Sequence, residues 1–165
     1  MISPIEPVDA VLNVAWSFRW VRETHGANRG EAVDEMIRLT ALDPSGRYPW
    51  CAAFVAYCGY AALRDLWPLP KLAGCASLGD AALARHMLEP APARGAIFLI
   101  FGTASDGAKR FKHTGYIRRE LGAPGSGVWE TIEGNTNDGG SPEGTGVFVR
   151  SRTFGPDDRF IWWWI

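Results

Sequence analysis

The chain contains the stretch Tyr48-Pro49-Trp50-Cys51-Ala52-Ala53-Phe54-Val55-Ala56-Tyr57, and the residues stay apolar or small as far as about Leu66. Pro49 suits the start of a helix, because its fixed φ fits there and its missing N–H is not needed. The run is apolar on every side, which is typical of a central helix that is buried all round. The sequence therefore predicts a buried helix whose first turn carries Cys51.

A cysteine in a first helical turn lies next to unpaired backbone N–H groups that carry partial positive charge. Such a position lowers the pKa of a thiol, and free N–H groups there can also hold a developing oxyanion. The alternative is that Cys51 is a small apolar residue of the core.

Composition limits the class of protein. A chain of 165 residues with 47% hydrophobic residues is expected to form one domain, spanning residues 1–165. The net charge is −1, and no basic block stands out, so nucleic-acid binding is not supported. No run approaches the roughly 18–20 apolar residues of a membrane span. The N-terminus lacks the basic start and apolar core of a signal peptide, so we expect a chain made and folded in the cytoplasm.

The cysteines and histidines do not indicate a metal site or a disulfide framework. Cys51, Cys58 and Cys75 are odd in number and match no zinc spacing. The loop that begins at Asp43 offers only one charged oxygen, whereas calcium needs several. We expect neither a metal nor a cofactor.

The order of elements predicts an α+β fold, because helical patterns come first and strand patterns follow. A lead-in helix is expected within residues 7–25, ended by Gly26, and a second helix is expected after an Asn28 cap, with Glu31 as its partner. A third helix is expected over residues 78–88. The expected strands of an antiparallel sheet of five to six strands cover residues 96–101, 113–117, 128–133, 146–150 and 159–164.

A glycine-rich segment and a run of three tryptophans stand out in the second half of the chain. Residues 134–146 hold five glycines and are expected to form a long mobile loop. The closing Trp162-Trp163-Trp164 either belongs to the core or binds sugar, and we favour the core with alternate rings packing inward.

Attack of a cysteine on a carbonyl needs a base and a group that orients the base. His113 begins an expected strand and can project towards the start of the cysteine helix. Further along, Glu133 and Asn135 lie on one face if their strand persists, so either could bond the second nitrogen of His113. Alternatively, Glu133-Gly134-Asn135 is only the turn chemistry of a strand end.

Four motifs occur in order: Asn28-Arg29-Gly30, Pro49-Trp50-Cys51-Ala52-Ala53-Phe54-Val55, His113-Thr114-Gly115-Tyr116-Ile117 and Thr131-Ile132-Glu133-Gly134-Asn135-Thr136. Together they resemble the CHAP branch of the NlpC/P60 cysteine peptidases and amidases, over about residues 28–163. The resemblance implies a papain-like fold and cleavage of bacterial peptidoglycan. It places the nucleophile on Cys51, the base on His113 and the orienting group on Glu133, with Asn135 beside it.

The sequence departs from this family in two places. Gly95-Ala96 stands where the family often has Gly-Asp at the start of the first strand, which concerns the anchoring of the strand rather than the chemistry. The acidic calcium loop of some members is also missing, in agreement with the expectation of no metal.

The expected reaction is amide hydrolysis through a thioester, with Tyr48 as the candidate second oxyanion donor and Trp50 as a further substrate-binding candidate. The bond is left open between N-acetylmuramoyl-L-alanine amidase and endopeptidase cleavage. The expected role is a monomeric phage or prophage endolysin that acts on the periplasmic cell wall after release by a holin. Alternatives are a secreted antibacterial effector with an immunity protein as partner, a non-catalytic wall-binding or phage structural module, and a papain-like peptidase or transferase acting on proteins.

Overall fold

The computed structural model describes residues 6–136 and 144–164, which form an α+β fold. Four α-helices come first in this part of the chain: α1 (Pro7–Ser17), α2 (Glu31–Leu39), α3 (Cys51–Leu63) and α4 (Cys75–Ala84). Short 3-10 turns, η1 (Pro44–Gly46) and η2 (Arg64–Leu66), flank α3. The strands follow as β1 (Leu88–Glu89), β2 (Ile97–Thr103), β3 (Lys109–Glu120), β4 (Trp129–Thr136), β5 (Gly146–Arg152) and β6 (Arg159–Ile161).

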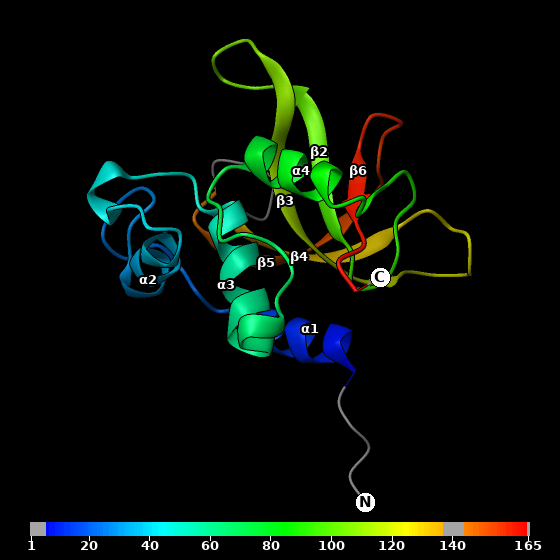
Figure 1. Ribbon diagram of the computed structural model, residues 1–165, viewed down its shortest axis with the longest axis horizontal. Coiled ribbons are helices and arrows are strands. Elements are labelled where there is room, and N and C mark those ends of the chain that lie inside the picture. The colour runs from blue at the N-terminus through cyan, green and yellow to red at the C-terminus, as the bar shows by residue number, and fades with distance from the viewer. Residues whose placement is uncertain (1–5, 137–143, 165) are drawn as a thin grey trace, which may run out of the picture.

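The six strands form one antiparallel sheet in the order β1-β6-β2-β3-β4-β5. The last strand of the chain, β6, is inserted between the short edge strand β1 and β2, and Figure 1 shows it beside β2. The coarse prediction, helices followed by an antiparallel sheet of five to six strands, is confirmed.

The central element is α3, which packs against α1 and α2 and also against β3 and β4 (Figure 1). Most of its residues are buried, as its uniformly apolar sequence predicts. Gly134 of β4 permits the close approach of this helix. A Cβ at Gly134 would lie only 2.6 Å from Cβ of Phe54 and 2.9 Å from the Trp50 ring. The start of α3 is therefore seated directly beside Glu133.

The lead-in helix expected within residues 7–25 is shorter than predicted, because α1 ends at Ser17. The chain beyond it is extended along the edge strand β5, where Arg22 forms a bridge with Gly146. The N–H of Val147 donates to the carbonyl of Val21, and the N–H of Glu23 donates to Thr145. Sheet hydrogen bonds thus replace the last turns of the expected helix.

Two other helix predictions need correction. The N-cap of α2 is Gly30 rather than Asn28, which has a φ of 57° and donates its side-chain amide to the carbonyl of Arg47 instead. The third helix covers Cys75–Ala84 rather than residues 78–88. It ends early because Leu88 and Glu89 pair with β6 as the short strand β1, which was not predicted.

Residues 102–112, which lie between the expected strands 96–101 and 113–117, are largely strand. β2 and β3 remain paired as far as Thr103 and Lys109, so only a tight turn joins them. β4 persists to Thr136 and β5 begins at Gly146, but residues 137–143 of the expected mobile loop lie outside the described residues.

The tryptophans after β6 belong to the packing of the protein. Trp163 is buried, with its ring centroid 5.1 Å from that of Trp67, and its Nε1 donates to the carbonyl of Gly95. Trp162 and Trp164 are half-buried and stack on each other. The expectation that alternate rings pack inward is confirmed for Trp163.

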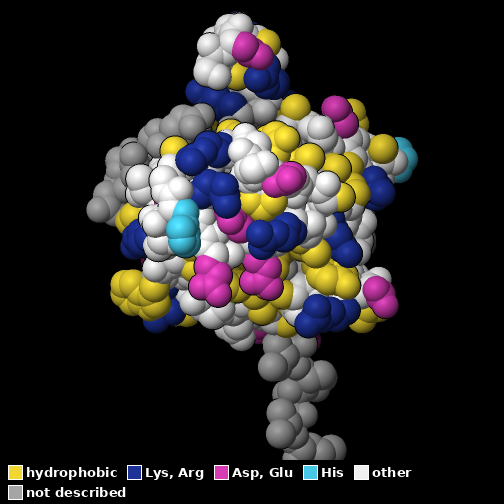
Figure 2. All heavy atoms as spheres, turned by 90° about the vertical axis from the view of Figure 1, so that its left-hand side faces the viewer, with side chains coloured by type: hydrophobic (Ala, Val, Ile, Leu, Met, Phe, Trp, Pro, Cys, Tyr) yellow, Lys and Arg dark blue, Asp and Glu magenta, His cyan; other side chains and the backbone are white. Residues whose placement is uncertain are grey.

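The face of the molecule that carries α2 has charges of both signs (Figure 2). Figure 2 shows basic and acidic side chains interspersed on the face that carries α2, rather than gathered by sign. Within residues 6–136 and 144–164, every helix is too short or too polar to cross a membrane.

Candidate active site

Cys51 is the first residue of α3, and its side chain is almost completely buried. The preceding residue, Trp50, is the N-cap and offers no side-chain hydrogen bond to the helix. The first N–H groups of the helix therefore have no partner within it and surround the thiol with partial positive charge. This is the position that the Pro49 signal predicts.

His113 lies on β3 with 2% of its surface exposed. Its Nε2 is 2.7 Å from Oε2 of Glu133. A carboxylate can only accept, so Nε2 carries the proton of this bond, and a neutral ring would have its lone pair on Nδ1. Among the described residues Nδ1 has no hydrogen-bond partner. Cys51 interacts with the same ring and raises its pKa. The Cys51 thiol is therefore the group from which Nδ1 can accept a proton.

Glu133 is a fully buried carboxylate with all of its charge compensated. Arg152 of β5 binds it through two nitrogens, Nε at 2.5 Å from Oε1 and a terminal nitrogen at 2.6 Å from Oε2. The hydroxyl of Thr131, two residues back along β4, donates to Oε1 at 2.5 Å. Because both oxygens are held, the position of Oε2 against His113 is fixed.

Gly115 leaves the space that this carboxylate occupies. A Cβ at Gly115 would lie 2.9 Å from Cγ of Glu133, 2.9 Å from the Phe98 ring and 2.7 Å from the carbonyl of Ile132. The Gly in His113-Thr114-Gly115 therefore allows Glu133 to approach the strand that carries the histidine.

These contacts shift the pKa values of all three groups in the direction that favours charge. Burial opposes the charge on His113, but Cys51 and Glu133 outweigh it and raise the pKa of His113 to about 9. Burial also opposes the charge on Glu133, yet Arg152 and His113 lower its pKa to about 2. The pKa of the Cys51 thiol is lowered well below its usual value by Cys75 and, against the effect of burial, by His113. All three shifts act in the same sense, in favour of a thiolate, an imidazolium and a carboxylate over the neutral groups.

Cys51 opens onto a cavity of about 460 Å³. The segments that lead into α3 and α4, together with the first residues of these helices, form one wall, and the β2–β3 hairpin forms the other. The first wall includes Leu42, Tyr48, Pro49, Cys51, Ala73, Gly74, Cys75 and Ala76, and the second includes Thr103, Ala104, Ser105, Arg110, Phe111 and Lys112. A volume in this range is typical of sites that bind small molecules. The described residues of the lining include basic side chains, Arg110 and Lys112, and no acidic ones.

Of the other site residues predicted from the sequence, some line this cavity and some are buried away from it. Tyr48 lines it and is partly exposed, with its ring over Gly46. Trp50 does not line it; the ring is fully buried and its Nε1 donates to Glu23. Asn135 is also fully buried, and its φ is 53°. The carboxylate of Glu133, and not Asn135, is the group hydrogen-bonded to His113.

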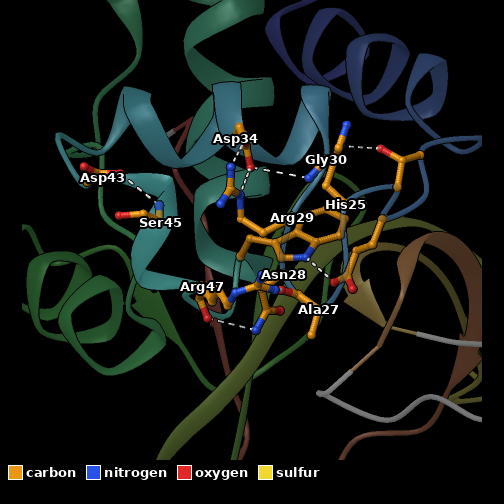
Figure 3. Close-up of polar contacts among 12 residues, drawn as sticks. His25, Ala27, Asn28, Arg29, Gly30, Asp34, Asp43, Ser45 and Arg47 are labelled. Carbon is orange, nitrogen blue, oxygen red and sulfur yellow. Dashed lines mark hydrogen bonds and ion pairs between the residues drawn. The ribbon is translucent and has the colours of Figure 1, made fainter.

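A polar network supports the loop that leads to Cys51 (Figure 3). Arg29 binds both oxygens of Asp34 at 2.8 and 2.9 Å, Asn28 donates to the carbonyl of Arg47, and Arg47 donates to Ala27. Figure 3 also shows Asp43 accepting from the N–H of Ser45 within η1. The motif Asn28-Arg29-Gly30 thus acts on the site indirectly, by joining residues 27–34 to the residue before Tyr48.

Two residues in contact with this site, Cys75 and Arg152, were not predicted from the sequence. Cys75 is the first residue of α4, and its Sγ lies 3.4 Å from Sγ of Cys51. The signal that could have located it is Gly74, which precedes a helical pattern as an N-cap can. Arg152 had no comparable signal, because its pairing with Glu133 depends on the register of β4 and β5.

Among the described residues, no group of three or more His, Cys, Asp or Glu side chains is gathered as a metal ion would require. Comparison of the chain with family models, with curated proteins and with solved structures finds no match.

Proposed function

We propose that this protein is a papain-like cysteine hydrolase that cleaves an amide bond in the peptide of bacterial peptidoglycan. The observation that supports a hydrolase activity is the combination of Cys51 at the start of α3, His113 beside it, and the Glu133 carboxylate 2.7 Å from Nε2 of that ring. The choice of peptidoglycan is supported by the four motifs that resemble the CHAP branch of the NlpC/P60 enzymes.

The proposed reaction begins with the Cys51 thiolate, whose proton resides on Nδ1 of His113. The sulfur attacks the amide carbon, and the C=O electrons move onto oxygen. That oxyanion is stabilised by backbone N–H groups at the start of α3 and by a second donor, for which Tyr48 is the candidate. His113 then gives its proton to the leaving nitrogen, so that the C–N bond breaks and an amine departs.

The second half of the reaction removes the acyl group from the enzyme. Water attacks the thioester, and His113 takes a proton from it, which leaves a carboxylic acid and restores the thiolate–imidazolium pair. Glu133 keeps the ring in the orientation and tautomer that both halves need. No step changes an oxidation state, and the proton that His113 gives to the leaving nitrogen is replaced by the one it takes from water.

The test is digestion of purified peptidoglycan, followed by turbidity and by mass spectrometry of the fragments. We expect new amino groups without new reducing sugar ends, and the fragment masses identify the bond as muramoyl-L-alanine or as a bond within the peptide. Cys51→Ala and His113→Ala should be inactive although folded. Activity of Cys51→Ala equal to the parent would overturn the mechanism, and efficient digestion of casein with none of peptidoglycan would overturn the substrate.

A further inference from the structure

Two helices begin at the same point in this molecule, each with a cysteine as its first residue. α3 begins at Cys51 and α4 begins at Cys75, and their sulfur atoms are 3.4 Å apart. Both thiols are buried and both lie on the wall of the cavity. The separation is too long for a disulfide and lies within hydrogen-bond range for sulfur. One sulfur therefore carries the proton and the other accepts it.

The surroundings decide which sulfur is the donor. His113 and the backbone N–H of Ala52 both lower the pKa of the Cys51 thiol, so a negative charge is stabilised there. Cys75 has no imidazole beside it, and its pKa is raised by the hydrogen bond with the neighbouring Cys51 and by burial. The proton of the pair therefore stays on Cys75, and the charge stays on Cys51.

We propose that Cys75 is a further catalytic residue, whose S–H donates a hydrogen bond to the Cys51 thiolate and stabilises the nucleophile before attack. The thiol of Cys75 touches the reacting atom itself, so its role is direct. When the thiolate forms its bond to the substrate carbon, the charge leaves the sulfur and Cys75 loses its acceptor. The donor therefore increases the amount of thiolate and also moderates its reactivity, as stabilised thiolates are less nucleophilic.

The shape of the cavity agrees with this role. Ala73, Gly74 and Ala76, the neighbours of Cys75 along the chain, line the cavity together with both cysteines and have small side chains. Cys58 is the natural contrast within the same chain. It lies seven residues along α3, is fully buried and is inert by comparison, since burial raises its pKa.

This inference rests on the proposed thiolate chemistry, but its test needs no peptidoglycan. Iodoacetamide alkylates thiolates, and the rate at Cys51 as a function of pH gives the apparent pKa of that thiol. Peptide mass spectrometry separates Cys51 from the other cysteines. If peptidoglycan is the wrong substrate, the titration of Cys51 is unaffected. If Cys75 is not a donor, replacing Cys75 does not shift the apparent pKa of Cys51, even in an active hydrolase.

We expect Cys75→Ala to raise the apparent pKa of Cys51 by about one unit, which slows alkylation roughly tenfold at a pH below that pKa. Cys75→Val, which is closer to cysteine in volume but has no donor, should shift it equally. Cys75→Ser retains an O–H donor and should restore a value close to that of the parent. Cys58→Ala is the matched control and should leave the titration of Cys51 unchanged.

Two results would overturn the proposal. One is a Cys75→Ala protein whose Cys51 titrates as in Cys58→Ala, and the other is a Cys75→Ser protein as impaired as Cys75→Ala, which would indicate packing. A reciprocal measurement covers the case in which these variants do not fold. In Cys51→Ala, Cys75 no longer faces a neighbouring anion, so its thiol should titrate at lower pH than in the intact protein. An unchanged titration of Cys75 would contradict the hydrogen bond.

Discussion

Oε2 of Glu133 lies 2.7 Å from Nε2 of His113, and both side chains are closed off from solvent. The same carboxylate is bound by Arg152 and Thr131, so a single buried anion joins β3, β4 and β5. A buried charge of this kind is tolerated only where it is paired and hydrogen-bonded. The arrangement therefore fixes the imidazole in one orientation.

Glu133→Gln should lower kcat by roughly tenfold or more and change KM less than kcat. The amide keeps the shape of the side chain but no longer stabilises the imidazolium. The pKa of His113 should fall as well, since one of the groups that raise it is lost. Steady-state kinetics over a pH series measures both effects. Asn135→Ala is the comparison: a rate near normal in Glu133→Gln with a collapse in Asn135→Ala would transfer the orienting role to Asn135.

Gly115→Ala should destabilise the protein by roughly 1–3 kcal/mol, because the added methyl meets Glu133, the Phe98 ring and a backbone carbonyl at under 3 Å. It should also reduce activity by moving the carboxylate away from His113. Urea denaturation and kinetics measure the two effects separately. Gly155→Ala is the matched control, since its Cβ would meet only Asp158 at 3.7 Å, an ordinary contact. Equal stability of the two variants would contradict the close packing of Gly115.

The pH dependence of activity follows from the shifted groups. His113 has a pKa of about 9, raised from 6.5, so the imidazolium is present below that pH and is lost as the pH rises through it. We expect the rate of peptidoglycan cleavage to be sustained at neutral pH and to fall through about pH 9, because the acid that protonates the leaving nitrogen disappears. A fall centred near pH 6.5 would mean that Cys51 and Glu133 do not act on the ring.

Stability should respond at the acid end. The pKa of Glu133 is lowered from 4.5 to about 2, so its contribution is fully present above pH 4.5 and is lost as the pH falls through 2. We expect an acid-induced loss of unfolding free energy of the order of 3 kcal/mol in this window, from the size of the shift. Glu133→Gln, measured by urea denaturation at a series of pH values, should lack this part of the acid dependence.

The sequence placed Cys51 at a helix start and His113 on a strand because the signals for both positions are local. Pro49 before an apolar run marks a helix start, and strand alternation places Glu133 near the histidine strand. The partner of His113 could not be chosen between Glu133 and Asn135, because the choice depends on Gly115 and Gly134, whose role is to let other elements approach. The register of β5, which brings Arg152 to Glu133, is equally non-local.

The elements that the sequence did not predict, or predicted at the wrong residues, all depend on contacts with distant segments of the chain. Residues 21–23 follow a helical pattern, yet hydrogen bonds to β5 hold them extended. Leu88 and Glu89 continue a helical run but pair with β6, a strand more than 70 residues away. Cys75 became part of the site only because α4 is folded back so that its first residue meets the first residue of α3.

The 3.4 Å separation of Cys51 and Cys75 also predicts sensitivity to peroxide. Hydrogen peroxide should oxidise the Cys51 thiolate to a sulfenic acid, with hydroxide as the other product. The Cys75 thiol can then attack that sulfur, which forms a disulfide and releases water. We expect rapid loss of activity that dithiothreitol reverses, together with a Cys51–Cys75 crosslink detected by non-reducing peptide mass spectrometry. In Cys75→Ser the crosslink cannot form, so continued oxidation of Cys51 to the sulfinic acid should make the loss irreversible, whereas Cys58→Ala should behave as the parent. Reversible inactivation of Cys75→Ser to the same extent would show that Cys75 does not resolve the oxidised nucleophile.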